Sequence, residues 1–192
     1  LIRSRGLGDV YKRQGGGAFS DDETKLLVSS DESGIFNVYE IDIASGEKTQ
    51  KTFSKKESFF AIDYLPGTNN ILYSADKGGN EINHIYLMSE DGKISDLTPG
   101  KNEKASFAGW SKDKKSMYYI SNKRNPKFFD FYKMKIDTWK SEMLYQNDNG
   151  INISDMSEDE SWFSFSQTIT TSENKLFLTN RIDKSTIELS VE

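Results

Sequence analysis

The chain has 192 residues, of which 35% are hydrophobic and 12% aromatic, enough to bury a core in one or two domains. It contains no run of about 18 apolar residues, so the sequence predicts no membrane-spanning helix. It also has no cysteine, which excludes disulfides and thiolate metal sites and leaves the cellular compartment open.

The first segment, residues 1–14, differs in composition from everything after it. It carries four basic residues against one acid, Asp9, and it lacks the apolar core and cleavage site of a signal peptide. It resembles a translated sequencing adaptor, so we expect a non-native segment with the natural N-terminus upstream. The rest of the chain is then more acidic than the whole-chain net charge of −5. That acidity argues against nucleic acid or an anionic membrane surface as a partner.

Four segments further along share one pattern, in which a large apolar or aromatic anchor precedes a short polar turn and then an apolar run. The anchors are Phe19, Tyr64, Trp110 and Met156. Successive anchors are 45, 46 and 46 residues apart. A serine follows three of the four anchors, which indicates that the same turn recurs.

Each repeat continues with a second polar stretch, a second strand pattern, a turn and a last strand pattern. The second polar stretches, expected to be connections, lie at 31–34, 76–81, 122–127 and 170–174. The second strands are expected in IFNVYEIDI, HIYLMS, FDFYKMKID and KLFLTN, and the last strands in KTQKTF, ISDLT, SEMLY and TIELSV. Asp91-Gly92, between two of these runs, is a strong hairpin signal. With the strand that leads into each anchor, the pattern predicts four strands in about 46 residues.

Four antiparallel strands at this period are typical of a propeller blade. We therefore predict an all-β fold, a partial β-propeller of about four four-stranded antiparallel blades, with the first strand of the first blade truncated. A β-sandwich would not explain the register. The expected inner strands lie at 58–64, 105–110 and 150–156. The predicted blades span residues 15–54, 55–100, 101–147 and 148–192.

Ser111 follows Gly109-Trp110, which is how a serine hydrolase elbow often begins. The elbow motif needs a second glycine, but Asp113 stands there and a strand pattern follows instead of a helix. The triad histidine must also follow the serine in that fold, and the only histidine, His84, precedes it. We therefore expect Ser111 and Asp113 to cap the turn by bonding backbone N–H groups two residues on.

No metal or cofactor site is predicted. His84 is expected to be a packed or hydrogen-bonded strand residue, with Glu81 in a loop as the nearest acid. Asp63, Asn152 and Asp155 lie on predicted inner strands, where they are expected to line a channel and to be solvated. A metal hydrolase would need several such groups from different blades. The acidic run at 148–160 lacks the spacing of a calcium loop.

Three stretches resemble the N-terminal propeller of bacterial serine peptidases of the prolyl oligopeptidase family, including dipeptidyl-peptidase and acylaminoacyl-peptidase-like members. The most telling pieces are DKGGNEINHIY, LTPG and NPKFFDFYKM. The resemblance extends over residues 15–192. Repeats of the S-x-D-x-x kind also occur in TolB-like periplasmic propellers.

The resemblance implies a parent protein that hydrolyses short peptides with a C-terminal α/β-hydrolase domain, which this chain lacks. The propeller would then cover the active site and filter peptides by size. No catalytic, cofactor-binding or metal-binding residue carries over to this chain, so the chain alone is not expected to catalyse a reaction. The expected partner is a peptide substrate, and a homo-oligomer is also compatible with the sequence. The parent protein is expected in the bacterial cytoplasm, in the periplasm or outside the cell. The alternative is a TolB-like scaffold that binds proteins or peptides without catalysis.

Overall fold

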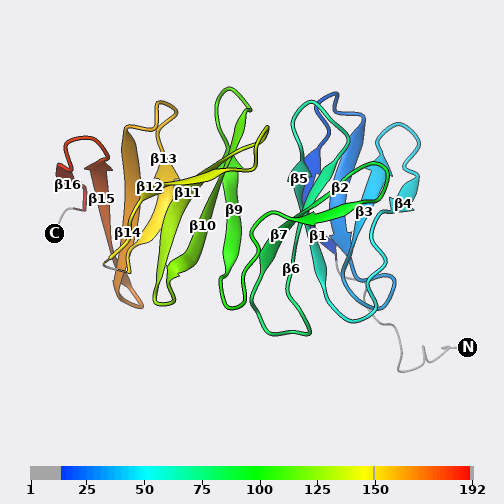
Figure 1. The fold of residues 1–192 in the computed structure, drawn as a ribbon, viewed down its shortest axis with the longest axis horizontal. Helices are drawn as coiled ribbons and strands as arrows, with labels where there is room; N and C mark the ends of the chain where they lie inside the picture. The colour runs from blue at the N-terminus through cyan, green and yellow to red at the C-terminus, as the bar shows by residue number, and fades with distance from the viewer. Residues whose placement is uncertain (1–13, 149, 191–192) are drawn as a thin grey trace, which may run out of the picture. The chain divides into compact units, whose positions relative to one another are not determined.

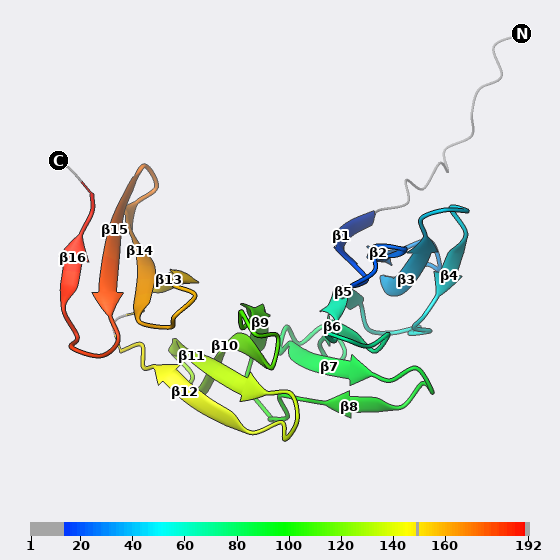
Figure 2. The same cartoon turned by 90° about the horizontal axis from the view of Figure 1, so that it is seen from above.

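A computed structural model describes residues 14–148 and 150–190. The described residues divide into two compact units, and the boundary in the sequence lies between Thr98 and Pro99. Each unit contains two four-stranded antiparallel sheets (Figure 1). Within every sheet the strands lie in chain order, as Figure 2 shows for β13 to β16. The predicted all-β fold of four blades is confirmed, because four sheets of this order are what successive propeller blades form.

The first unit holds sheets one and two. Sheet one consists of β1 (Gln14–Phe19), β2 (Lys25–Ser30), β3 (Asn37–Asp42) and β4 (Lys48–Gln50). Sheet two consists of β5 (Phe59–Tyr64), β6 (Ile71–Ala75), β7 (His84–Met88) and β8 (Ile94–Asp96). The hairpin predicted at Asp91-Gly92 joins β7 to β8.

The second unit holds sheets three and four. Sheet three consists of β9 (Ala105–Trp110), β10 (Ser116–Asn125), β11 (Phe128–Lys135) and β12 (Ser141–Tyr145). Sheet four consists of β13 (Asn152–Met156), β14 (Trp162–Thr170), β15 (Glu173–Asn180) and β16 (Thr186–Glu188).

Two details of the prediction were wrong. The first blade was expected to lack part of its first strand, but β1 starts at Gln14 and pairs with β2 from Gln14–Ser30 to Phe19–Leu26. The polar stretch at 122–127 was expected to be a connection, but β10 continues through Asn125. Arg124 holds this extension, because its guanidinium donates two hydrogen bonds to Asp130 at the start of β11. The prediction that residues 1–14 are non-native concerns residues that, except for Gln14, lie outside the described part.

The first strand of every sheet carries a β-bulge, at the same register in β5, β9 and β13 and one residue pair earlier in β1. One residue is left without a cross-strand partner in each, namely Gly16, Ile62, Ala108 and Ser154. These residues are spaced 46 apart. The same separation in sequence occurs between the turn residues that hydrogen-bond from one sheet to the next, Asp21 with Gly67 and Lys112 with Glu158. A bulge bends its strand and redirects the next side chains. The repeat is therefore a repeat of backbone geometry as well as of sequence.

Apolar faces of successive sheets form the core of each unit. In the first unit, Leu27 and Val38 of sheet one pack with Tyr64, Ile71 and Tyr73 of sheet two. In the second unit, Tyr118, Phe131 and Leu144 of sheet three pack with Phe163 and Phe165 of sheet four. Since one sheet cannot bury both its faces, each unit is stabilised by stacking a sheet on its neighbour.

Candidate functional site

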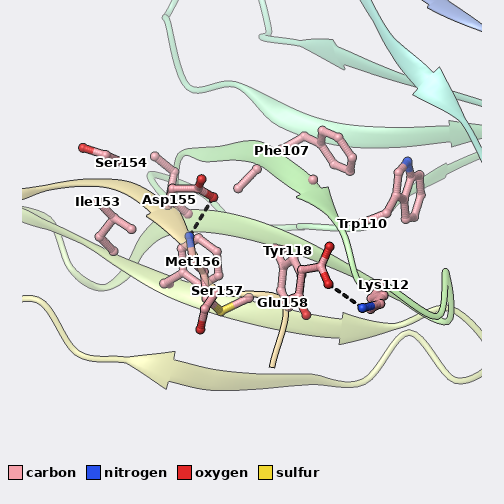
Figure 3. A pocket seen from close by; sticks show the side chains of 14 residues that line it. Phe107, Trp110, Lys112, Tyr118, Ile153, Ser154, Asp155, Met156, Ser157 and Glu158 are labelled. Carbon is pink, nitrogen blue, oxygen red and sulfur yellow. Dashed lines mark hydrogen bonds and ion pairs between the residues drawn. The ribbon is translucent and has the colours of Figure 1, made fainter. Parts of the chain in front are cut away.

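A pocket of about 430 Å³ lies in the second unit, where β9 and the start of β10 meet β13 and the turn after it (Figure 3). Its volume falls within the range of small-ligand sites. It is lined by Phe107, Ala108, Gly109, Trp110, Lys112, Tyr118, Ile120, Phe131, Ile153, Ser154, Asp155, Met156, Ser157 and Glu158. We call this cavity the β9–β13 pocket.

The two bulges of the second unit shape the pocket. Ala108 and Ser154 are the unpaired residues of β9 and β13, and both line the cavity. Gly109, next to the first bulge, has a φ of 133°, a conformation that side chains with a Cβ rarely adopt. A Cβ at this position would meet no atom within 4 Å, so the glycine leaves open space at the pocket wall.

Aromatic rings form much of the wall. Phe107 and Trp110 lie on either side of Gly109, and their rings meet edge to face with centroids 5.2 Å apart. Tyr118 and Phe131, both buried, also line the pocket, with ring centroids 5.6 Å apart. Edge-to-face and offset pairs of this kind hold rings in fixed positions, so the wall is preorganised.

Asp155 places a carboxylate in the pocket (Figure 3). The residue is exposed, and its Oδ1 accepts a hydrogen bond from the backbone N–H of Met156 at 2.7 Å. Asp63 makes the same contact in the first unit, where its Oδ1 accepts from the N–H of Tyr64 at 2.8 Å. Gly109 occupies the equivalent place in sheet three. The pocket therefore has the carboxylate of Asp155 on β13 and open space beside Gly109 on β9.

An ion pair marks one end of the pocket. Lys112 Nζ and Glu158 Oε2 are 2.5 Å apart, and the hydrogen bond that Lys112 donates to Glu158 raises the pKa of Lys112. Both side chains are more than 70% exposed, so the pair adds little to stability. It does neutralise the Glu158 charge, which leaves Asp155 as the carboxylate of the pocket without a paired cation.

Glu160 joins sheets three and four beside the pocket. Its Oε1 accepts hydrogen bonds from Tyr118 Oη at 2.6 Å and from Lys133 Nζ. Burial disfavours the charged form, but the bonds from Lys133 and Tyr118 outweigh burial, so the pKa of Glu160 is lowered. Glu160 thus carries a charge that two neighbouring strands of sheet three hold in place.

Ser111 is a turn residue whose hydroxyl is bonded within its own turn. Its Oγ donates to Asp113 Oδ1 at 2.7 Å and accepts from the N–H of Ser116 at 2.9 Å. The predicted capping role is confirmed for Asp113, which accepts from the N–H of Lys115 two residues on. For Ser111 the partner was wrong, because its hydroxyl closes a five-residue loop. Ser20 and Ser157 make the same bonds, to Lys25 and Trp162.

His84 is buried and hydrogen-bonded, as predicted, and the acid that it contacts is not Glu81, the nearest in sequence. Its Nδ1 lies 2.7 Å from Oδ2 of Asp96 on β8, whereas the N–H of Glu81 bonds to Asp76. Asn37 and Asp130 hold the equivalent place in sheets one and three, and each bonds to the segment at or after the fourth strand. His84 therefore ties β7 to β8 in a structural contact whose counterparts occur in sheets one and three.

The acids of the 148–160 run do not gather around one point. Asp148 pairs with Arg124, Glu158 with Lys112, and Asp159 with Ser157 and Ser161. Among the described residues, no group of three or more histidine, cysteine and acidic residues has a geometry that could hold a metal ion. No helix in the same part of the chain is long and apolar enough to span a membrane.

Sequence reasoning placed Asp63, Asn152 and Asp155 on the first strands, where the structure has them. It missed the pocket around Asp155. The signal was available in the aligned repeats, since Gly109 replaces an aspartate found at the same place in the repeats on either side.

Comparisons with known proteins agree with this fold. Residues 21–180 match the family described as the dipeptidyl peptidase IV (DPP IV) N-terminal region. Dipeptidyl aminopeptidase BIII of Pseudoxanthomonas mexicana is 32% identical over 102 residues, which make up 52% of this chain and 14% of that protein. The chain thus corresponds to a small part of that relative's length.

Two solved structures show the same fold at low identity. TolB from Acinetobacter baumannii matches with a TM-score of 0.65 and 16% identity, over 93% of this chain and 44% of that one. Dipeptidyl peptidase 4 from Porphyromonas gingivalis matches with a TM-score of 0.63 and 15% identity, over 96% of this chain and 27% of that one. The similar scores mean that the fold alone does not separate a peptidase propeller from a TolB-like one.

Proposed function

This chain belongs to the family of dipeptidyl peptidase IV N-terminal regions, and on that premise we propose that its propeller filters peptides by size before they reach an α/β-hydrolase domain of the same parent protein. The observation that carries the proposal is the family match over residues 21–180, which contain β2 to β15 and so include strands of all four sheets. The chemistry would be acyl transfer through a serine ester on the hydrolase domain, outside this chain.

The arrangement of Ser111 supports a non-catalytic role for the propeller itself. A serine nucleophile needs a base within hydrogen-bond reach of its hydroxyl. The acceptor of the buried Ser111 hydroxyl is Asp113, a weak base because the hydrogen bonds from Ser111 and from the N–H of Lys115 lower its pKa. Ser20 and Ser157 repeat this arrangement. A repeated serine with a structural role in three sheets does not distinguish any one of them as a nucleophile.

A TolB-like scaffold is the second candidate, supported by the TolB match over 93% of this chain. The two candidates differ in what the parent protein does with a peptide. A scaffold would bind it and release it unchanged, whereas a peptidase propeller would pass it on for cleavage. The family match favours a peptidase propeller, which passes the peptide on for cleavage.

The size filter is tested on the full-length parent protein with a series of blocked peptides of increasing length that share one cleavable end. We expect kcat/KM to fall by more than tenfold between the shortest and longest peptides. Glu160→Gln, which weakens the contact between sheets three and four, should raise the rate for long peptides more than for short ones. Glu142→Gln, at an exposed site on β12, is the matched control. Equal rates for all lengths would contradict the filter.

A further inference from the structure

We propose that the β9–β13 pocket binds the guanidinium group of an arginine side chain in a peptide. The proposal rests on the proposed function only for the identity of the ligand as a peptide. The pocket itself is defined by residues of the second unit alone. Three features carry the inference: an exposed carboxylate, aromatic rings around it, and the neutralisation of the other nearby charges.

The first feature is the charge of Asp155. Its Oδ1 already accepts one backbone N–H, so the carboxylate is held in a fixed orientation on β13. A carboxylate offers about four acceptor positions, so Asp155 keeps acceptor capacity on both oxygens for a further donor. Arginine presents parallel N–H groups that match such a carboxylate in a two-bond pairing.

The second feature is the aromatic wall. Phe107 and Trp110 border the open space left by Gly109, across the pocket from β13 (Figure 3). Cations are attracted to the faces of aromatic rings, tryptophan most strongly, and a planar guanidinium also stacks on them. An ammonium group lacks that plane. The wall therefore favours arginine over lysine.

The third feature is the balance of the remaining charges. Lys112 is held by Glu158, and Lys133 is held by Glu160, so neither lysine competes for Asp155. Glu158 and Glu160 are neutralised by the same pairs. The remaining negative charge in the pocket is then that of Asp155, so the pocket prefers a ligand with a single positive charge.

The repeat explains why this pocket is confined to one place in the second unit. Asp63 has the same backbone contact as Asp155, but Asp63 does not line the pocket. The strand before β13 carries Gly109 at the equivalent position, whereas the strand before β5 carries Ala18. The pair Asp63 and Asp155 thus offers a natural comparison between a carboxylate outside the pocket and one inside it.

The test measures binding of short peptides to the purified 192-residue chain by ligand-observed NMR saturation transfer. The probe is Gly-Gly-Arg-Gly-Gly, acetylated and amidated to remove the terminal charges. The same peptide with citrulline is its uncharged isostere, and the lysine peptide tests the preference for a guanidinium. We expect the arginine peptide to bind at least tenfold more tightly than the citrulline peptide, and more tightly than the lysine peptide.

Two matched variants locate the site. Asp155→Asn should weaken arginine binding by about tenfold, whereas Asp63→Asn, which alters the same backbone contact in the first unit, should leave it unchanged. Phe107→Leu should weaken binding as well, since it removes a ring of the wall. Equal binding of the arginine and citrulline peptides would overturn the proposal, and so would an equal loss in both aspartate variants. Equal binding of the lysine peptide would overturn the assignment of a guanidinium. Because no hydrolysis is measured, these outcomes are independent of the size filter.

Discussion

Tyr118 on β10 donates a hydrogen bond of 2.6 Å to Glu160, which lies 42 residues later in the turn before β14. The same carboxylate oxygen accepts from Lys133 on β11, so one side chain of the fourth sheet bridges two strands of the third. The first unit has a similar contact with the two roles exchanged between the sheets. There the tyrosine is on the later sheet, since Tyr64 of sheet two donates to Glu40 of sheet one at 3.0 Å. In both units a tyrosine–glutamate contact supplements the apolar packing between sheets.

Glu160→Gln should destabilise the second unit by about 2 kcal/mol, because it replaces a charge-assisted contact with Lys133 by a weaker neutral one. The side chain of Glu160 is only 19% exposed, so water compensates for little of the loss. Urea unfolding monitored by tryptophan fluorescence measures the change. Glu142→Gln at an exposed position of β12 is the control, and an equal effect of the two variants would contradict the role given to Glu160.

Asp130→Asn should cost about 3 kcal/mol, because Asp130 is fully buried and its carboxylate is bonded to Arg124, Tyr132 and the N–H of Asn147. Removing the charge leaves the Arg124 guanidinium without its main partner. Asp137→Asn, at an exposed turn position, is the matched control and should change stability by less than about 0.5 kcal/mol. A similar loss in both variants would sink this account.

The carboxyl group of Asp130 should also make the folded chain less stable in acid. Burial raises the pKa of Asp130, but the bonds from Arg124 and Asn147 outweigh burial, so its pKa in the folded chain lies below the ordinary value of 3.8. A lowered pKa means that the unfolded chain takes up the proton first. The contribution of Asp130 is therefore complete above the unfolded pKa and is lost as the pH falls through the folded one. Urea midpoints between pH 6 and pH 3 should fall more steeply for the wild-type chain than for Asp130→Asn.

Lys114→Gly should stabilise the chain by about 0.5 kcal/mol. Lys114 has a φ of 58° in the turn after Ser111, a left-handed conformation in which a Cβ is strained and glycine is not. Lys115→Gly, one residue on and outside that conformation, should destabilise because glycine loses more entropy on folding. Thermal unfolding of both variants checks the prediction. A lower melting temperature for Lys114→Gly than for the wild-type chain would show that strain at this turn is not relieved by glycine.

The fourth sheet should make the isolated chain self-associate. Leu176 and Ile187 are about half exposed on the face opposite Phe177, and Leu178 pairs with Ile187 on that face. Exposed apolar faces of this size favour association. The double variant Leu176→Lys, Ile187→Lys should be more monomeric in sedimentation velocity at micromolar concentration. Ile182→Lys, in the exposed turn before β16, serves as the control. A monomeric wild-type chain would contradict the prediction.

The repeat made most of the fold predictable from sequence, because the anchors recur every 45 or 46 residues and each recurrence corresponds to one four-stranded sheet. Side-chain contacts across strands were harder to predict. The partner of His84 depends on the register of the hairpin that follows it, which brings Asp96 closer than the acid nearest in sequence. The extension of β10 depends on Arg124 reaching Asp130, a contact that local propensity does not contain.

The pocket shows a different reason for failure. Two of its residues were noted in the sequence, Trp110 as a repeat anchor and Asp155 as an expected channel-lining residue, but each was judged by itself. The cavity arises from the bulges at Ala108 and Ser154 and from the missing side chain at Gly109. A bulge is an irregularity of pairing, and the alternation of apolar residues does not reveal it.

The most direct test of the account is to read the coding sequence of the parent gene beyond codon 192. A peptidase propeller predicts further blades followed by an α/β-hydrolase domain, with a serine in a Gly-x-Ser-x-Gly motif and then an aspartate and a histidine. Further blades followed directly by a stop codon would contradict the peptidase assignment and would leave a binding scaffold as the function of this chain.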